Sequence, residues 1–425
     1  MNKKILLIAY YWPPSGGPGV QRWLKMSHYL AEMGCDITVL TVDEADAHYP
    51  HRDEGLTDEV HSSIKVIRTK AFNPYRIFGS KKRGQQPAAN FSVPNQGRLR
   101  FQVLAFVRSH LFIPDPRRGW NYWAKKRALA LCKTEGFETV ITTSPPHSTQ
   151  LIGLYLKRKM GIQWIVDFRD PWTQIFYYHT LNHSAFSRFL DARYERRVVR
   201  NADKIIHVGQ TMVDMLADMH PETRSKSVVV HNGYDERDFN EVKRGPASEG
   251  IHLAYTGTLS SSYDYQSLFR AIQLASERKK TITCTLSGQI PQEIQAEVKM
   301  LCPIVEFTGE LPHAEITKRQ CWADLLLLVL PNVPNAAYIL SGKLFEYLRS
   351  GNQILCLGPV GGDADKVLQS CEAGRTFERQ QEKAIADWIV ARAEEKSSGK
   401  RRASIESEVQ KYSRENLATT VFELL

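Results

Sequence analysis

The 425-residue chain has no long hydrophobic run. Its longest apolar stretches, residues 5–12 and 325–330, are far shorter than the roughly 20 residues that a membrane-spanning helix requires. A basic start followed by apolar residues 5–9 resembles a signal peptide in outline. However, aromatic residues and two prolines follow where a small-residue cleavage site would stand. We therefore predict a cytoplasmic protein without a transmembrane helix or an export signal.

Paired cysteines are also missing. The seven cysteines are scattered along the chain, odd in number, and never arranged as Cys-x-x-Cys. This spacing offers no zinc-binding framework. It is typical of reduced thiols in a cytosolic protein.

Acidic residues are scarce in one part of the chain. Residues 70–127 contain 13 Lys and Arg but a single acid, Asp115, and the formal charge of the whole chain is +10. Residues 1–200 hold 30 basic and 16 acidic side chains, whereas residues 201–425 hold 26 and 30. The excess favours an anionic partner, for which nucleic acid, anionic lipid and a phosphorylated substrate all qualify. A solvated basic face without a partner would give the same composition.

The sequence does contain short apolar runs that alternate with amphipathic helical stretches, which predicts parallel sheets covered by helices. Strands are expected at 5–10, 36–42, 139–143, 164–168, 204–208 and 227–231, and in a second series at 252–256, 281–287, 305–307, 325–330 and 353–357. Helices are expected at 20–33, 99–113, 147–159, 264–278, 313–321, 342–350 and 363–371. Residues 48–97 are expected to form long loops.

The fold class is therefore α/β, with two tandem Rossmann-like, doubly wound domains facing across a cleft. The predicted N-terminal domain spans 1–240 and includes the basic insertion at 70–127. The predicted C-terminal domain spans 250–408, after a polar seam at 232–250. Residues 409–425 contain a last helix, for which Ser413 is the expected N-cap.

Doubly wound domains bind ligands beyond the carboxyl ends of their strands, so the strand-to-helix junctions carry the candidate site. The first junction reads PPSGGPG at 13–19. Gly16 and Gly17 allow positive φ and a close backbone approach. The helix N-terminus that follows offers N–H groups and a positive dipole end to a phosphate. A tight connecting loop without a ligand is the alternative.

Two further junctions of the first domain contain polar and aromatic side chains. His147 opens a helix, where the dipole disfavours its protonated form, and it can hydrogen-bond a hydroxyl or act on a proton. In the segment VDFRDPW, Asp170 can accept hydrogen bonds from hydroxyls and Trp172 can stack on a ring. A structural histidine is one alternative. An ion pair of Arg169 with Asp167 or Asp170 that only shapes the loop is the other.

The most informative motif of the second domain is SGKLFEYLRSG at 341–351. Ser341, Gly342 and Lys343 lie at the N-terminus of a short, largely buried helix, ready for a pyrophosphate. Glu346 is about one turn further and can accept both hydroxyls of a ribose. An exposed ion pair between Lys343 and Glu346 is the alternative.

The turn after the first strand of the second series reads YTGTL at 255–259. Gly257 permits a close backbone approach to a nucleotide diphosphate, with Thr258 beside it. A plain strand-to-helix turn is an equally good interpretation of this motif alone.

Taken together, these motifs resemble those of family 4 glycosyltransferases of the two-domain GT-B architecture. The matching segments cover nearly the whole chain in the family's order: residues 10–22, SPPHS at 144–148, DFRDPW at 167–172, residues 201–210, HNGYD at 231–235, YTGTL at 255–259, FTGELPH at 307–313, ADLLLL at 323–328 and GKLFEYL at 342–348. The resemblance implies retaining transfer of a sugar, hexosyl or related, without a metal or a cofactor. The C-terminal domain would hold the nucleotide-sugar donor, and the N-terminal domain would hold the acceptor. The final helix would pack back on the N-terminal domain.

The resemblance also assigns residues by position. Donor-binding residues would be Gly16, Gly17, Gly257, Thr258, Ser341, Gly342, Lys343 and Glu346; catalytic residues His147 and Asp170; and acceptor-loop residues Arg169 and Trp172. Within the donor site, Glu346 would hold the ribose and residues 341–343 the phosphates. His147 would contact the sugar.

Two positions depart from the family's pattern. The family often has two glutamates with seven residues between them, and Tyr338 occupies the first position, eight before Glu346. The family also often places an Arg and a Lys after the Gly-Thr strand, where this chain has SSSYDY at 260–265. Lys343 is expected to supply that positive charge.

For partners, we expect a glycan or polyprenyl-linked acceptor in surface polysaccharide assembly. An anionic membrane surface is a further candidate, because residues 70–127 combine basic and aromatic side chains. The protein would then lie peripherally on the inner face of the cytoplasmic membrane. Nucleic acid is not expected, since no recognised binding motif is present. A sugar-nucleotide epimerase and a non-catalytic sugar-nucleotide binder remain as alternatives.

Overall fold

The computed structural model describes residues 3–72, 112–181, 183–240, 242, 245, 250–279, 281–400 and 404–425. The helix predicted at 99–113 and most of the basic stretch at 70–127 lie outside these residues. The chain divides into two compact units. The first comprises Met1–His231 and Leu417–Leu425, and the second comprises Asn232–Asn416.

The first unit is built on a seven-stranded parallel sheet. Its strands are β1 (Lys4–Ile8), β2 (Asp36–Val42), β3 (Lys65–Thr69), β4 (Thr139–Ser144), β5 (Gln163–Phe168), β6 (Lys204–His207) and β7 (Ser227–Val229). They pair in the order β3-β2-β1-β4-β5-β6-β7. The strand order switches direction between β1 and β4. The loops after these two strands therefore flank the point where such sheets bind ligands.

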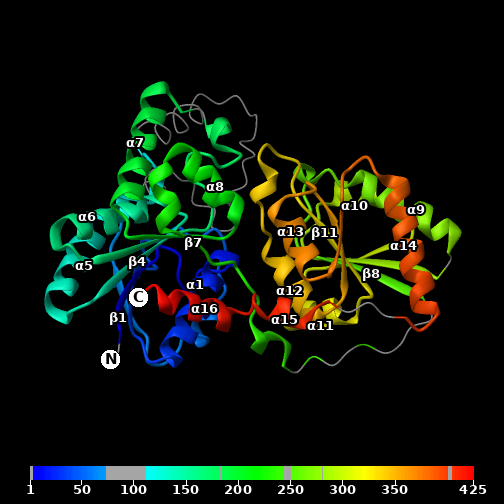
Figure 1. The fold of residues 1–425 in the computed structure, drawn as a ribbon, viewed down its shortest axis with the longest axis horizontal. Helices are drawn as coiled ribbons and strands as arrows, with labels where there is room; N and C mark the ends of the chain where they lie inside the picture. The colour runs from blue at the N-terminus through cyan, green and yellow to red at the C-terminus, as the bar shows by residue number, and fades with distance from the viewer. Residues whose placement is uncertain are drawn as a thin grey trace. The chain divides into compact units, whose positions relative to one another are not determined.

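Helices cover both faces of this sheet (Figure 1). They are α1 (Pro18–Glu32), α2 (Gly55–Asp58), α5 (Asn121–Glu135), α6 (Gln150–Met160), α7 (Ala185–Asn201) and α8 (Gln210–Met219), with 3-10 turns η1 (Pro116–Trp120), η2 (His147–Thr149), η3 (Tyr178–Leu181) and η4 (Pro221–Lys226). Helix α1 packs on a face formed by alternate strand residues such as Ile5, Leu7 and Val39. On the opposite face α6 approaches so closely that a Cβ on Gly153 would clash with the indole of Trp164.

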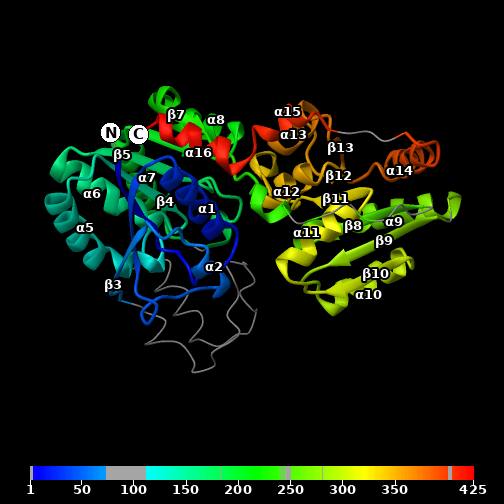
Figure 2. The same cartoon turned by 90° about the horizontal axis from the view of Figure 1, so that it is seen from below.

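The end of the chain belongs to the first unit. Helix α16 (Arg414–Glu423) begins after Ser413, whose Oγ accepts a hydrogen bond from the N–H of Asn416 at 3.2 Å. This confirms the predicted N-cap. The two termini lie side by side in both views (Figures 1 and 2), and Lys3 Nζ donates to the carbonyl of Phe422 at 2.9 Å.

The second unit is built on a six-stranded parallel sheet in the order β10-β9-β8-β11-β12-β13. The strands are β8 (Ile251–Thr256), β9 (Ile282–Ser287), β10 (Val305–Gly309), β11 (Leu325–Val329), β12 (Gln353–Leu357) and β13 (Gly374–Phe377). The helices are α9 (Gln266–Arg278), α10 (Gln292–Leu301), α11 (His313–Trp322), α12 (Gly342–Ser350), α13 (Asp363–Ser370), α14 (Glu382–Ser397) and α15 (Glu406–Gln410), with 3-10 turns η5 (Glu236–Phe239), η6 (Ser261–Tyr263) and η7 (Ala336–Tyr338). Two separate apolar cores fill the two faces: α9, α10 and α14 pack on one, and α12 and α13 on the other.

Some elements differ from the sequence prediction. Residues 48–97 were expected to be loops, but β3 and α2 lie within them. The side chains of β3 are half-buried or exposed, so its apolar alternation is weak at the edge of the sheet. The prediction also omitted β13 and the helices α5, α7, α8, α10 and α14. Helix α14 buries Ile385, Ala386, Ile389 and Ala393 beneath a surface rich in Glu, Lys and Arg, which masks its apolar stripe in the sequence.

Two negative findings apply to the described parts of the chain. No helix there is long and apolar enough to cross a membrane. All seven cysteines, each of them in a described range, are free thiols.

Candidate active site

In the first unit, the glycine-rich loop predicted from the sequence joins β1 to α1. Gly17 is the N-cap of α1 with φ +101°, a conformation that favours glycine. Gly16 donates its N–H to the carbonyl of His51 at 3.0 Å, and a Cβ on Gly16 would press on the His51 ring. The loop is thus pinned by residues 51–53, and the N-terminus of α1 begins at its end.

The charged cluster at the end of β5 separates into two ion pairs. Arg169 pairs with Asp170 at 3.0 Å, which selects one of the two partners that the sequence left open. Asp167 instead is fully buried and accepts two hydrogen bonds from Arg22, at 2.9 and 3.3 Å to Oδ1. The Arg169 guanidinium lies where a Cβ on Gly19 would be, so Gly19 leaves room for the arginine beside the first turn of α1.

Arg22 was not singled out from the sequence, yet it ties three parts of the first unit together. Besides Asp167, it donates to the carbonyls of His231 and Val230 at 2.6 and 2.9 Å. Asp167 also accepts from the Trp23 indole and from the Thr143 hydroxyl, each at 2.7 Å. This buried network fixes α1 against the carboxyl ends of β4 and β5.

His147 opens η2 after β4, where it was predicted. Its ring stacks on Trp172 with centroids 5.0 Å apart, and its Nε2 is 3.5 Å from the backbone carbonyl of Asp170. Burial lowers the pKa of His147, although the carboxylates of Asp115 and Asp170 act in the opposite direction. A neutral imidazole at this edge can donate or accept a hydrogen bond without adding charge.

Trp172 is arranged differently from the expectation that it stacks on a ligand ring. It is buried, one ring face is occupied by His147, and its indole donates to Asp191 at 2.8 Å. Burial raises the pKa of Asp191 to about 6. The adjacent Glu195, which accepts from the Thr173 hydroxyl at 2.6 Å, is raised by burial to a pKa of about 7. Trp172 therefore positions His147.

Asp115 is the single acid of the basic stretch. Its carboxylate accepts hydrogen bonds from the N–H and the hydroxyl of Ser148 at 2.7 and 2.8 Å, and from the N–H of Arg117 at 2.9 Å. It therefore caps η1 and the first turn after β4 at once. The carboxylate thereby helps to hold the turn that begins with His147.

In the second unit, α12 positions the predicted phosphate and ribose ligands. Its apolar side is buried, and Tyr347 fixes it to β8, because the Tyr347 hydroxyl accepts from the Thr256 N–H at 3.0 Å. Lys343 and Glu346 are three residues apart and lie on one side of this helix. Ser341 is the N-cap but makes no capping hydrogen bond with its side chain, and a Cβ on Gly342 would meet no described atom within 4 Å.

Lys343 reaches the turn after β8. Its Nζ and Cε lie where a Cβ on Gly257 would be, and Gly257 has φ +120°. Nζ donates to the Tyr255 hydroxyl at 3.0 Å and lies 4.4 Å from the centroid of that ring. Within the described chain no carboxylate forms an ion pair with Lys343. Burial lowers its pKa to about 8, partly offset by Glu346. Thr258, beside this turn, is exposed, and its carbonyl accepts from the Tyr255 hydroxyl at 2.6 Å.

Glu346 is held by two side chains of α11 that the sequence did not point to. Gln320 donates to its Oε2 at 2.8 Å, and His313 Nε2 is 3.7 Å from its Oε1. Burial alone would raise the pKa of Glu346, but the hydrogen bonds and charge of these neighbours outweigh it and lower the pKa. The carboxylate is thus ionised and fixed in direction. Gln320 and His313 lie 26 and 33 residues away in sequence, so no local spacing could reveal them.

The predicted site residues thus gather in two clusters, one at the strand ends of each unit. Gly16, Gly17, His147, Arg169, Asp170 and Trp172 belong to the first, and Gly257, Thr258, Ser341, Gly342, Lys343 and Glu346 to the second. Tyr338, in the position of the family's first glutamate, is buried in η7. Among the described residues, no group of three or more His, Cys, Asp or Glu side chains could hold a metal ion.

The two parallel α/β units match the GT-B fold of solved glycosyltransferase structures. A family model described as a glycosyl transferase 4-like domain matches residues 16–233. The chain belongs to this glycosyltransferase family. No curated protein sequence matches the chain.

Solved structures are similar to the whole chain. Anabaena HepE in complex with UDP has a TM-score of 0.61 at 13% identity and covers 99% of both chains. TarM has a TM-score of 0.60 at 10% identity, over 100% of this chain and 99% of TarM. A further HepE structure contains UDP-glucose, with a TM-score of 0.60 at 11% identity over 99% of this chain and 98% of HepE. At such identities the likeness establishes the fold.

Proposed function

We propose that the protein transfers a sugar, hexosyl or related, from a nucleotide-sugar donor to a glycan or polyprenyl-linked saccharide, with retention and without a metal. The acceptor chemistry corresponds to surface polysaccharide assembly on the cytoplasmic side of the membrane. The observation that carries the proposal is the Lys343 ammonium beside Gly257, without an ion-pair partner in the described residues. A partly buried cation at a glycine turn and a helix N-terminus suits a diphosphate.

Glu346 extends the same site toward a ribose. Its ionised carboxylate has acceptor capacity beyond the bonds from Gln320 and His313, which suits a vicinal diol. Gly342 adds open space over the first turn of α12. HepE, which has the same fold, binds UDP and UDP-glucose in its crystal structures. A uridine diphosphate sugar is therefore the first donor to test.

The first unit would supply the groups around the transferred sugar. We assign His147, which is neutral, and Asp170 to the transferred sugar, and Arg169, which pairs with Asp170, to the acceptor loop. Gly16 and Gly17 are assigned to the donor phosphates. In a front-face reaction the acceptor oxygen bonds to the anomeric carbon as the bond to the diphosphate oxygen breaks. The acceptor proton passes to the departing phosphate oxygen. Rate enhancement would come from positioning and electrostatic stabilisation of that leaving group.

An anionic membrane surface is the further partner that we propose. Helix α7 exposes Phe186 and Phe189, which are 69% and 62% accessible, and α5 exposes Tyr122 at 70%. Exposed aromatic side chains beside basic ones suit an interfacial location. Retention on vesicles of phosphatidylglycerol at low salt, reduced in Phe186→Ser/Phe189→Ser, would support this partner. Equal retention of both proteins would remove it.

The test of the donor site is a thermal-shift panel of UDP, GDP, ADP, CMP and dTDP, each with and without a sugar. A ligand at 100 times its Kd stabilises a protein by about 2.7 kcal/mol. We expect one nucleotide to stabilise the wild type and to fail with Glu346→Gln. The exposed Glu394→Gln on α14 is the matched control. Equal shifts in both variants would remove Glu346 from the site.

Product analysis separates the remaining functions. A glycosyltransferase releases nucleoside diphosphate only when an acceptor is present and extends that acceptor. An epimerase changes the sugar without an acceptor, and a non-catalytic binder is stabilised by nucleotide but forms no product.

A further inference from the structure

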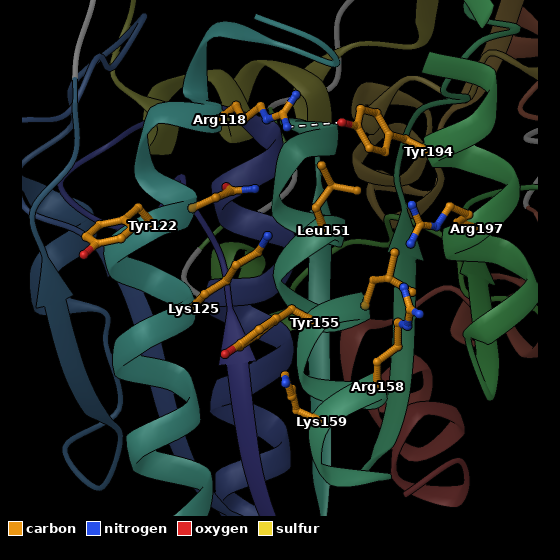
Figure 3. A pocket seen from close by; sticks show the side chains of 11 residues that line it. Arg118, Tyr122, Lys125, Leu151, Tyr155, Arg158, Lys159, Tyr194 and Arg197 are labelled. Atoms are coloured by element: carbon orange, nitrogen blue, oxygen red, sulfur yellow. Dashed lines mark hydrogen bonds between the residues drawn. The ribbon is translucent and has the colours of Figure 1, made fainter. Parts of the chain in front are cut away.

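A groove lies on the helical surface of the first unit. It spans η1, α5, α6 and α7, with α6 in the middle, and has a volume of about 680 Å³ (Figure 3). Leu151 and Leu154 of α6 form part of its floor, and both are buried. Three tyrosines, from α5, α6 and α7, line it as well. None of these residues takes part in the glycosyl-transfer site proposed above.

The charge of the groove is of one sign. Five of its lining side chains are cationic and none is acidic: Arg118, Lys125, Arg158, Lys159 and Arg197. Other cations of the same helices do have acid partners, since Lys157 pairs with Asp203 at 2.7 Å and Arg200 with Glu222 at 3.0 Å. The cations of the groove form no ion pair with any carboxylate of the described chain. Positive charge is therefore concentrated where no acid neutralises it.

The positive charge gathered in the groove lowers the pKa of one of its own lysines. Burial and the neighbouring Arg118 both lower the pKa of Lys125. Like charges in a partly dehydrated site repel more strongly than they do in water. A bound anion would offset both the burial of the Lys125 ammonium and its repulsion by Arg118, because it supplies a countercharge.

One donor of the groove, Arg118, is held in place by hydrogen bonds. Arg118 donates to the carbonyl of Ile113 at 2.6 Å and to the Tyr194 hydroxyl at 3.1 Å, the bond drawn in Figure 3. Its guanidinium carbon lies 5.2 Å from the centroid of the Tyr194 ring, which supports it from one side. Arg158 and Arg197 point from α6 and α7 into the same space (Figure 3). Planar guanidinium groups bind phosphate oxygens in pairs, and a donor that is already ordered loses little entropy on binding.

We propose that this groove binds a phosphate group carried by a lipid headgroup or a soluble phosphate ester, through Arg118, Lys125 and Arg197. The leucines and tyrosines would contact the organic part of that ligand. The cations line one hollow, which favours a single phosphate or diphosphate over a polynucleotide. The proposal does not depend on the glycosyl-transfer function, because no groove residue is assigned to the donor, the transferred sugar or the acceptor loop.

The chain offers a matched pair of variants. Lys125→Gln/Arg197→Gln removes two positive charges from the groove. Lys126→Gln/Arg196→Gln removes the same charge from the adjacent residues of the same helices, which are exposed and outside the groove. Each pair is made in the Lys343→Met background, so that the donor site proposed above contributes little to phosphate binding. Thermal unfolding establishes that both variants are folded. If the groove pair is unstable, Arg197→Gln alone replaces it, with Arg196→Gln as its control.

The first arm titrates inorganic pyrophosphate by calorimetry, and the second measures retention on vesicles of phosphatidylglycerol and phosphatidylcholine in equal parts. Relative to the Lys343→Met protein, we expect the groove variant to lose about tenfold or more in affinity in at least one arm, and the control variant to be unchanged. A loss in the first arm identifies a soluble phosphate, and a loss confined to the second identifies a headgroup. The proposal would be overturned if both variants lost affinity equally or if neither lost any. It would also be overturned if the groove variant lost affinity only for a single-stranded RNA oligomer.

Discussion

Replacing Lys343 with Met tests the proposed diphosphate site through its pH dependence. Burial lowers the pKa of this ammonium to about 8, so about nine-tenths of it is charged at pH 7 and about one-tenth at pH 9. A bound diphosphate favours the charged form and keeps it protonated at both pH values. The affinity of the wild type for its nucleoside diphosphate should then fall about tenfold between pH 7 and pH 9, or about 1.4 kcal/mol.

Calorimetric titration at pH 7, 8 and 9 measures this change. Lys343→Met should bind more weakly at pH 7 and show no such fall, whereas Lys366→Met, on the exposed side of α13, should behave as wild type. Titration of the nucleotide itself occurs with every protein and cancels in the comparison. Parallel loss of affinity in the wild type and Lys343→Met would refute the assignment of Lys343 to the phosphates.

The same pKa has the opposite effect on the protein without ligand. The unfolded chain, in which Lys343 has its ordinary pKa of 10.5, binds more protons than the folded chain between pH 8 and 10.5. The contribution of Lys343 to stability therefore rises with pH across that window. Ligand affinity and intrinsic stability should change in opposite directions, which separates a site effect from general unfolding.

Three further predictions concern stability, and urea unfolding checks each of them. Arg22→Met should lower the free energy of unfolding by about 3–5 kcal/mol, because it leaves the Asp167 carboxylate buried without its cation. The double variant Arg22→Met/Asp167→Asn should recover part of this loss. A loss below about 1 kcal/mol in Arg22→Met would contradict the reasoning. Gly153→Ala should lower the free energy of unfolding by about 1–3 kcal/mol, because the new methyl group would overlap the Trp164 indole. Gly342→Ala, whose methyl group would meet no described atom, should leave stability unchanged. Equal effects of the two changes would contradict the close packing at Gly153. Burial raises the pKa of Glu195 from 4.5 to about 7, so the buried ionised carboxylate destabilises the fold as pH rises through that window. Glu195→Gln should therefore stabilise the protein more at pH 8 than at pH 4. The reverse order would contradict this.

Most of the fold could be predicted from the sequence because its strands are buried on both faces. Such strands read as short, continuous apolar runs, and β2, β4, β5, β11 and β12 were found in this way. Edge strands show this property less reliably. β3 and β13 pair on one side only, and Arg68 and Arg375 interrupt their apolar pattern, so both were missed, whereas the edge strands β7 and β10 were predicted.

The candidate site could be predicted only as far as its main-chain geometry. Gly17 and Gly257 have the positive φ that their position between strand and helix suggested. The side chains that fix Glu346 could not be foreseen, because His313 and Gln320 reach it from another helix. The stacking of Trp172 on His147 was likewise hidden, since the two residues follow different strands.

The partner of Asp167, in contrast, follows from strand alternation once the structure shows that this carboxylate is buried beneath α1. Residues two apart in a strand face the same side of the sheet, so Asp167 lies on the side of Ile165, which packs with α1. A buried carboxylate on a face covered by a helix needs a cation from that helix, and α1 contains only Arg22 and Lys25 as permanent cations. Arg22 is one turn beyond Gly19, the residue that leaves room for Arg169. The ion pair therefore holds the glycine-rich loop and the loop after β5 in one geometry, so a change at Arg22 should alter the site as well as the stability.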